Sequence, residues 1–211
     1  MFTQKYKKYI LVSFLVLFSF LINKHYANYG VEPGDTFVLY NGGYKVLNGY
    51  VPFIDYWLTT GPLLDYLNAL FFILLDVNWQ AYTTHSSVFN VLIGISTFFF
   101  LKNFNINILL CFFYSATLSL MMYPVVGTPF VDHHSTIFMV ISFYFFSIAI
   151  KDKKYKFFIF IPSILLFSFL SKQTPASYGI IVLTILSLIE IFSRRDLSIL
   201  KFGILGVFLA I

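Results

Sequence analysis

The segment VEPGDTFVLYNGGYKVLNGYVPFIDYWLTTGP (Val31–Pro62) lies between two strongly apolar runs, Tyr9–Ile22 and Leu63–Val77. It combines acidic side chains with glycines and aromatic rings, whereas its neighbours consist mainly of Leu, Ile and Phe. Further apolar runs follow along the chain: Ser86–Leu101, Ile106–Tyr123, Thr136–Ile150, Phe157–Leu170, Tyr178–Phe192 and Ile199–Ile211. Apolar runs that alternate with short polar loops are typical of a chain that crosses a membrane several times.

The composition supports this interpretation. Only 11% of the residues are charged, against about 25% in a soluble domain, so a soluble protein is excluded. The formal charge of +5 does not indicate a nucleic-acid partner, because most Lys and Arg residues form short clusters between apolar runs. The single cysteine, Cys111, excludes an intrachain disulfide. We predict an all-α fold, a polytopic bundle of transmembrane helices that forms one membrane domain over residues 1–211.

The two ends of the chain carry further information. Lys5, Lys7 and Lys8 precede the first apolar run, which is either a signal peptide or an uncleaved span. We interpret it as an uncleaved span, because the chain after it is itself membrane-embedded and no small-x-small cleavage site follows. The sequence stops inside an apolar run at Ile211, where a free carboxylate is costly in hydrocarbon. We therefore expect an N-terminal membrane module of a longer protein.

Clusters of basic residues predict the topology. Lys5–Lys8, Lys151–Lys156 and Ser193–Asp196 are expected to face the cytoplasm, with the N-terminus. Three segments then lie on the outer side: Asn23–Thr60, Pro124–Ser135 and Ser171–Ser177. Several apolar runs are shorter than the ~20 residues that span a bilayer, so flanking Tyr, Trp and Asn residues are expected to complete the spans.

One conflict remains in this topology. Three apolar runs separate the outer loops that end at Thr60 and begin at Pro124, whereas an even number is required. We expect Leu63–Val77 to be interfacial or re-entrant, because Asp65 and Asp76 bracket it and it is only one short helix long. Alternatively, the lysine cluster breaks the positive-inside rule.

The first outer loop is expected to lie along the membrane surface. Thr36–Leu47 is interpreted as a short amphipathic helix that Gly42 and Gly43 break, and Gly61-Pro62 opens the next helix. Five aromatic residues of the loop are expected at headgroup depth: Tyr40, Tyr44, Tyr50, Tyr56 and Trp57.

The polar residues that carry chemistry gather in the three outer loops. They are Glu32, Asp35 and Asp55 in the first loop, Asp132, His133 and His134 in the second, and Lys172 and Gln173 in the third. If these loops meet, they offer carboxylates that act as a base and cations that bind an anion.

Each candidate also has a structural interpretation. Asp35 can cap a helix that begins at Thr36, Asp55 can hold an interfacial turn, and Lys172 can snorkel from the end of a span, although Gln-Thr-Pro after it favours an ordered loop. The adjacent residues His133 and His134 are expected to point apart. Four other residues are interpreted as interfacial, membrane-boundary or in-bundle: His85, near the other membrane surface, Asp65, Asp76 and Glu190.

The order of these motifs over about residues 9–180 resembles the GT-C superfamily of membrane glycosyltransferases. It is most similar to the bacterial group related to protein mannosyltransferases and lipid A aminoarabinose transferases. The resemblance rests on four motifs: LNGYVPFIDYW (Leu47–Trp57), GPLLDYLNALFFILL (Gly61–Leu75), VDHHS (Val131–Ser135) and SKQTP (Ser171–Pro175). Phe53 stands where Tyr is usual, and Asp55 holds the acidic position. Thr60–Pro62 reads TGP where many relatives have KPP, so a lysine contact to the donor phosphate has to come from Lys172 or a histidine.

The resemblance implies an inverting transfer of a sugar from a polyprenyl-phosphate donor to a glycan, lipid or protein acceptor, at the outer face of a bacterial inner membrane. Asp35 would be the catalytic base, and Asp132 would assist it or bind the acceptor sugar. The remaining loop residues would bind substrate or the donor phosphate: Asp55, His133, His134, Lys172 and Gln173. No metal is assigned, although Asp35, Asp132 and His133 are able to bind a divalent metal ion as a cluster.

Three other functions stay open. A transporter or flippase of lipid-linked or anionic substrates keeps its polar residues near the bilayer midplane, whereas here they lie toward one face. A polysaccharide polymerase or ligase shares the lipid-linked donor but needs a large outer loop late in the chain. A catalytically inactive fragment or assembly subunit has the same sequence features as an active module.

Overall fold

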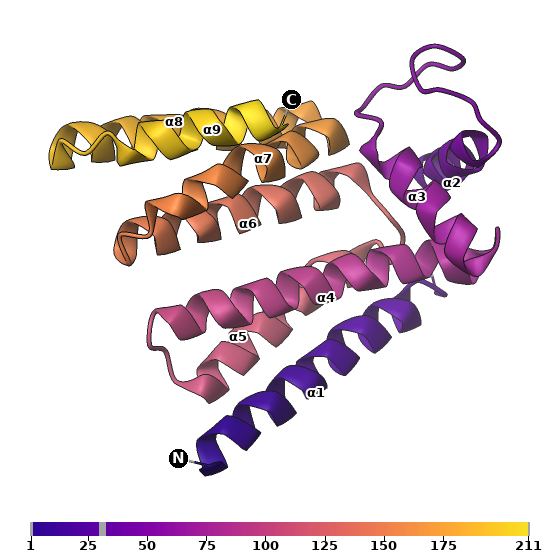
Figure 1. Cartoon of the computed structure of the whole chain (residues 1–211). Coiled ribbons are helices and arrows are strands. Elements are labelled where there is room, and N and C mark those ends of the chain that lie inside the picture. The colour runs from indigo at the N-terminus through magenta and orange to yellow at the C-terminus, as the bar shows by residue number, and fades with distance from the viewer. Residues whose placement is uncertain (1, 30–32, 211) are drawn as a thin grey trace. The chain divides into compact units, whose positions relative to one another are not determined.

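The computed structural model describes residues 2–29 and 33–210, and Glu32 lies outside them. The described residues form α-helices and short 3-10 turns without a β-strand, which confirms the all-α prediction (Figure 1). Five helices are long and apolar enough to cross a membrane: Tyr6–Tyr26, Trp79–Asn103, Ile108–Val125, Val131–Lys151 and Gln173–Arg194. The chain is therefore an integral membrane protein with a polytopic helical fold.

The chain divides into two compact units, Met1–His133 and His134–Ile211, and the boundary falls in the first turn of α6 (Val131–Lys151). The other elements of unit 1 are α1 (Phe2–Tyr26), α2 (Pro33–Leu47), α3 (Leu63–Leu75), α4 (Trp79–Asn103), α5 (Ile108–Met121) and the 3-10 turn η1 (Tyr123–Val125). Unit 2 contains the 3-10 turn η2 (Tyr155–Ile159), α7 (Phe160–Ser171), α8 (Gln173–Arg194) and α9 (Ser198–Ala210). That these units form one membrane domain stays a prediction.

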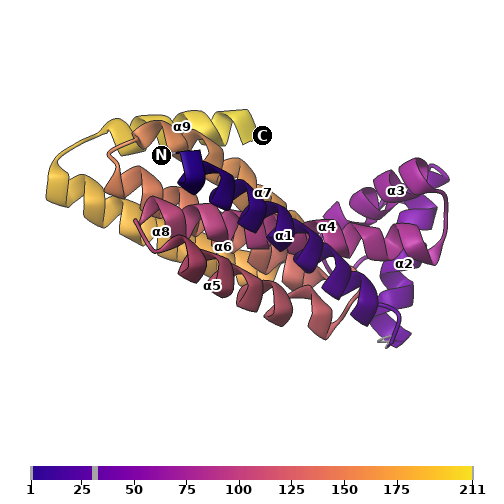
Figure 2. The same cartoon turned by 90° about the horizontal axis from the view of Figure 1, so that it is seen from below.

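Helices α1 and α4 of unit 1 lie side by side and run antiparallel (Figures 1 and 2). Near one end, the Lys24 ammonium donates a 2.8 Å hydrogen bond to the backbone carbonyl of Gln80. Near the other end, the Lys8 ammonium lies 4.8 Å from the ring centre of Phe99. Since Lys24 and Gln80 are neighbours, the chain between them leaves one end of the α1–α4 pair and returns to the same end.

Helix α3 is shorter than the five helices that are long enough to cross a membrane. It has 13 residues, which extend about 20 Å at 1.5 Å per residue, whereas the hydrocarbon core is about 30 Å thick. This length agrees with the expectation that Leu63–Val77 is the run that fails to span, which stays a prediction. If α4 and α5 then make two crossings, the parity conflict disappears without breaking the positive-inside rule.

Small polar side chains join α1, α4 and α5. Asn90 donates from Nδ2 to the Ser19 carbonyl at 2.9 Å, and the Ser19 hydroxyl donates to Ser119 at 2.9 Å. Gly94 faces both serines, where a Cβ would meet the Ser119 hydroxyl. Helices in lipid associate through such close packing and hydrogen bonds, because apolar burial gives little driving force there.

Two glycines let α2 and α3 approach closely. A Cβ at Gly42 would collide with the carboxylate of Asp65, and one at Gly43 would collide with Cβ of Asn68. Helix α2 is continuous from Pro33 to Leu47. The predictions that it begins at Thr36 and breaks at the glycines were therefore wrong. The two glycines do not interrupt the helix; they leave the space that α3 occupies.

Unit 2 is built on α6 and the η2–α7 segment, which run antiparallel. Ser135 and Ser168 approach within 3.1 Å at one end, and the rings of Phe146 and Phe158 lie 5.6 Å apart toward the other. The apolar helix Tyr155–Ser171 is shorter than the five long helices, as is Ser198–Ala210. Because a 3-10 turn rises faster per residue than an α-helix, η2 and α7 together extend about 28 Å. This segment is therefore nearly as long as the hydrocarbon core is thick.

Helices α8 and α9 complete unit 2. Gly179 of α8 lies against Met139 of α6, and Gly206 of α9 lies against the backbone carbonyl of Ile159. The buried core of this unit contains Phe146, Ala149, Phe158, Ile161, Leu165, Leu183 and Ile199.

The close packing of α2 on α3 makes a stability prediction. We expect Gly43→Ala to lower the free energy of unfolding by about 1–3 kcal/mol, because the added methyl group forces the two helices apart. The measurement is the thermal midpoint in detergent micelles, which should fall by several degrees. Gly203→Ala in α9 is the control, since a Cβ there meets nothing. Equal midpoints for the two variants would contradict the packing.

Candidate functional site

The acidic residues that the structure describes in unit 1 belong to α2, α3, the segments beside α3 and the first turn of α6. They are Asp35, Asp55, Asp65, Asp76 and Asp132. The opposite end of this unit carries Lys7, Lys8 and Lys102, and no acidic residue accompanies them in the described part of the chain. The two ends of unit 1 therefore differ in chemistry, and the carboxylates define the candidate site.

Asp35 occupies the first turn of α2, where the helix dipole favours a negative charge. Because the helix begins at Pro33, Asp35 is not the cap of a helix from Thr36. The Thr36 hydroxyl is buried 3.1 Å from the Thr128 hydroxyl, and the Thr36 carbonyl accepts a 3.0 Å hydrogen bond from Tyr82. The backbone at Asp35 is thus held in place while its side chain stays exposed.

The hydrogen bond between Thr36 and Thr128 joins the first and second predicted outer loops. Thr128 lies four residues before Asp132, which stands in the first turn of α6. The adjacent Gly127 has φ +78° and its carbonyl accepts hydrogen bonds from Asn23 at 3.1 Å and Ser86 at 2.7 Å. The loop before α6 is therefore fixed to α1, α4 and α2, and Asp35 and Asp132 belong to the same end of unit 1.

The two adjacent histidines point apart, as predicted. The half-buried ring of His133 packs against Tyr123 and Phe130, with ring centres 5.2 and 5.7 Å away. The buried ring of His134 lies 6.4 Å from Phe138. The Nδ1 atom of His133 is buried and finds no hydrogen-bond partner among the residues that the structure describes. His133 therefore joins the carboxylates of unit 1 with one ring nitrogen unused.

Lys172 and Gln173 belong to unit 2, as does His134. Lys172 is one extended residue between α7 and α8, and its carbonyl accepts a 3.0 Å hydrogen bond from Ser135. Gln173 is the first residue of α8. The predicted outer loop Ser171–Ser177 is thus a sharp helix–helix junction, which brings Lys172 to the end of unit 2 where α6 begins.

Asp55 has a structural role. Its carboxylate accepts a 2.7 Å hydrogen bond from the backbone N–H of Val51 and is exposed. Phe53, inside the same turn, has φ +69°. This matches the interpretation of Asp55 as a residue that holds a turn, and a contact to substrate stays a prediction.

The sequence interpretation underestimated a buried polar cluster between α2 and α3. Asp65 is 2% exposed, and its carboxylate accepts a 2.7 Å hydrogen bond from the Tyr56 hydroxyl. The Lys45 ammonium lies 4.6 Å from the centre of the Tyr56 ring. Burial raises the pKa of Asp65 to about 6, and the Tyr56 hydrogen bond and the Lys45 charge oppose this increase. The cluster ties the loop before α3 to the helix pair.

Asn68 lies one helical turn after Asp65 on the same face of α3. Its Nδ2 donates to the Leu39 carbonyl at 3.1 Å, and its Oδ1 lies 2.6 Å from Nδ1 of His85. The His85 ring is fully buried and stacks on Phe71 at 4.8 Å. The prediction of an interfacial His85 near the other membrane surface was wrong, because α3 packs against α4 and covers it. The spacing of Asp65 and Asn68 opposite the Gly42-Gly43 pair was the signal available for this cluster.

Among the residues that the structure describes, no three His, Cys, Asp or Glu side chains are grouped so as to hold a metal ion. Comparison with protein-family models, with curated proteins and with solved structures finds no match. Membership of the GT-C superfamily therefore stays a prediction from the sequence motifs.

The buried Asp65 makes a pH prediction. Its pKa of about 6 lies above the ordinary value of 3.8, so the folded protein holds this proton more tightly than the unfolded chain. We expect the free energy of unfolding to fall by up to ~3 kcal/mol as the pH rises from about 4 to about 6, and to stay low above that range. The measurement is the thermal midpoint in detergent at a series of pH values.

Two variants make this measurement specific. Asp65→Asn retains an acceptor for Tyr56 without a charge and should remove most of the pH dependence. Asp76→Asn alters an exposed carboxylate at the same end of unit 1, and this variant should retain the pH dependence of the thermal midpoint. A wild-type midpoint that does not change with pH, or an Asp65→Asn protein that keeps the change, would show that Asp65 does not titrate in this range.

Proposed function

We propose that the chain is a membrane glycosyltransferase, or the membrane module of one, that moves a sugar from a polyprenyl phosphate to an acceptor hydroxyl. The observation that carries the proposal is the arrangement around Asp35. An exposed carboxylate stands on a helix turn that the Thr36–Thr128 hydrogen bond ties to the loop before Asp132 and His133. This fits the order of motifs that the sequence shares with the GT-C superfamily.

The chemistry assigns a role to each of these groups. The Asp35 carboxylate takes the proton of the acceptor hydroxyl while the oxygen of that hydroxyl attacks the anomeric carbon. The bond from that carbon to the donor oxygen breaks, the configuration inverts, and the electron pair leaves with the polyprenyl phosphate. Positive charge nearby stabilises the leaving phosphate. The sequence motifs assign this role to His133, His134 and Lys172. Of these, His133 belongs to unit 1, and its Nδ1 has no hydrogen-bond partner among the described residues.

Charge distribution supports an outer-face site. Lys7, Lys8 and Lys102 mark one end of unit 1 as cytoplasmic under the positive-inside rule, which puts Asp35 and Asp132 on the other side. The proposed location is the inner membrane of a bacterium, with the N-terminus in the cytoplasm. A lipid-linked donor reaches such a site from within the outer leaflet.

The base assignment predicts the effect of Asp35→Asn. We expect sugar transfer to fall by at least about 100-fold, because the amide cannot accept the proton. The assay uses membranes that contain the full-length protein and polyprenyl phosphates carrying radiolabelled mannose, glucose or arabinose. Asp76→Asn, which removes the same charge from the same end of unit 1, should retain wild-type transfer at equal protein level. Unchanged transfer by Asp35→Asn would refute its role, and no transfer by the wild type from any donor would favour a transporter or an inactive fragment.

The orientation has a separate test. In a Cys111→Ala background, Ile54→Cys places a thiol at a position that is 80% exposed in the first loop. We expect a membrane-impermeant maleimide to label it in intact spheroplasts. Lys7→Cys should be labelled only after the membrane is opened. The reverse pattern would put the acidic end of unit 1 in the cytoplasm and contradict the proposal.

A further inference from the structure

One end of unit 2 carries a cavity lined with lysines. The turn between α6 and α7 has the sequence KDKKYK (Lys151–Lys156), and three of its lysines line a cavity of about 510 Å³. The residues that line it are Lys153, Lys154, Tyr155, Lys156, Phe157, Ser198 and Phe202. The cavity therefore combines ammonium groups with aromatic rings from η2 and α9.

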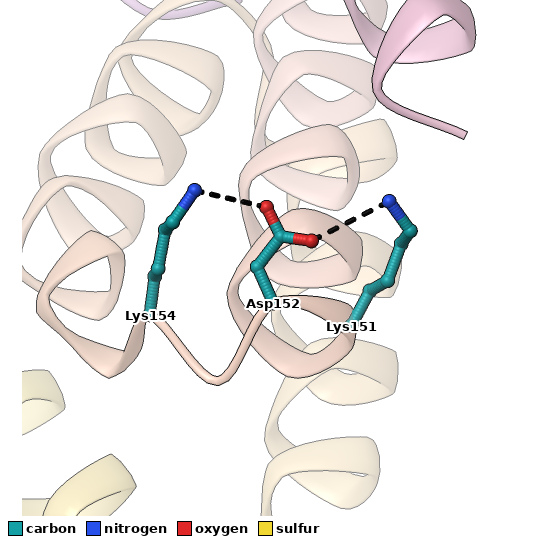
Figure 3. Close-up of polar contacts among 3 residues, drawn as sticks. All are labelled: Lys151, Asp152 and Lys154. Atoms are coloured by element: carbon teal, nitrogen blue, oxygen red, sulfur yellow. Dashed lines mark hydrogen bonds and ion pairs between the residues drawn. The ribbon is translucent and has the colours of Figure 1, made fainter. Parts of the chain in front are cut away.

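The single carboxylate in this turn neutralises only part of its charge. Asp152 pairs with Lys151 at 3.4 Å and with Lys154 at 3.1 Å, one lysine on each side (Figure 3). Within the described part of the chain, Lys153 and Lys156 have no acidic partner. The turn is nonetheless ordered, because the Lys154 N–H donates to the Ala149 carbonyl at 2.9 Å. Two of the lysines that line the cavity therefore carry a charge that no described carboxylate compensates.

A second, apolar groove lies along α7, α8 and α9. It has a volume of about 430 Å³ and almost entirely apolar walls. Phe158, Ile199 and Gly203 line the groove, and each directly follows a residue that lines the lysine cavity. Leu188 and Leu200 on its walls are each 45% exposed, so the groove is open to the surroundings of the helices. The two hollows share no lining residue but adjoin along η2 and α9, so a basic cavity lies next to an apolar groove.

We infer that this composite site binds an anionic phospholipid, with the phosphate headgroup among Lys153, Lys154 and Lys156 and an acyl chain in the groove. Charge complementarity selects the occupant. An apolar protein helix would leave the lysines without counter-charge, whereas an anionic lipid offers a phosphate to the lysines and an acyl chain to the groove. Basic pockets between transmembrane helices are known to bind such headgroups. The inference rests on unit 2 alone and does not depend on the proposed glycosyltransferase activity.

The test measures lipid retention by native mass spectrometry of the purified full chain in detergent. Phosphatidylglycerol and phosphatidylcholine with identical acyl chains are the probes. We expect the wild type to bind phosphatidylglycerol at least about tenfold more tightly than phosphatidylcholine. Lys153→Gln combined with Lys156→Gln should abolish this preference. Lys7→Gln combined with Lys102→Gln, which removes the same charge from unit 1, should leave it unchanged.

A second pair of variants tests the groove. Gly203→Leu adds a side chain where a Cβ meets no neighbouring atom, so it fills the groove and should weaken binding of both lipids at least about tenfold. Leu209→Phe, at a position of α9 that is 67% exposed and does not line the groove, is the control. If Gly203→Leu does not fold, Ser187→Leu fills the groove from α8.

Three results would overturn the inference. Equal binding of the two lipids by the wild type would exclude a headgroup site. An equal loss of preference in both lysine double variants would reduce the effect to surface charge. Wild-type binding by a folded groove-filling variant would exclude the groove as the site of the acyl chain.

Discussion

The side-chain amide of Asn23 is the contact on which the acidic end of unit 1 depends. Its Nδ2 lies within hydrogen-bond distance of Ser86, Ser87 and the carbonyl of Gly127, so one group joins α1, α4 and the loop before α6. The next residue of that loop, Thr128, then bonds Thr36 of α2. A buried amide that lost these partners would be costly in an apolar medium, which makes this arrangement strongly preferred.

Unit 1 separates two kinds of polar interaction. Between α1, α4 and α5 the buried polar residues are small and uncharged. Several of their hydroxyl and amide groups bond one another or backbone carbonyls, whereas Asn23 Oδ1 and Ser115 Oγ find no partner among the described residues. Between α2 and α3 a carboxylate is buried, with a tyrosine hydroxyl as its partner and a lysine nearby. Uncharged groups need only hydrogen bonds, whereas burial of a carboxylate shifts its protonation. This contrast fits helices that cross hydrocarbon and a short helix pair that does not.

Much of the helical organisation could be predicted from the sequence, but less of the candidate site. Trp79 and Asn103 extend the apolar run of α4, as expected for flanking residues. The aspartates beside Leu63–Val77 marked a run whose helix is shorter than the five candidate spans. His85 was misjudged, and the sequence did not indicate that Tyr56 is the partner of the buried Asp65. In a membrane protein the lipid-facing surface is as apolar as the core, so hydropathy along the chain does not show which polar residue another helix covers.

The sequence by itself determined the class of fold, the positions of the long helices and the concentration of lysines at one end of unit 1. The physical reason is that hydrocarbon permits only internally hydrogen-bonded helices of a minimum length and makes charge in their interior costly, and both constraints act on local sequence. Only the tertiary structure decided that α3 packs against Gly42 and Gly43 and that Asp65 and His85 are buried. It also decided that the helix turn of Asp35 is bonded to the loop before Asp132. These outcomes depend on contacts between helices that are distant in the chain, which no local pattern specifies.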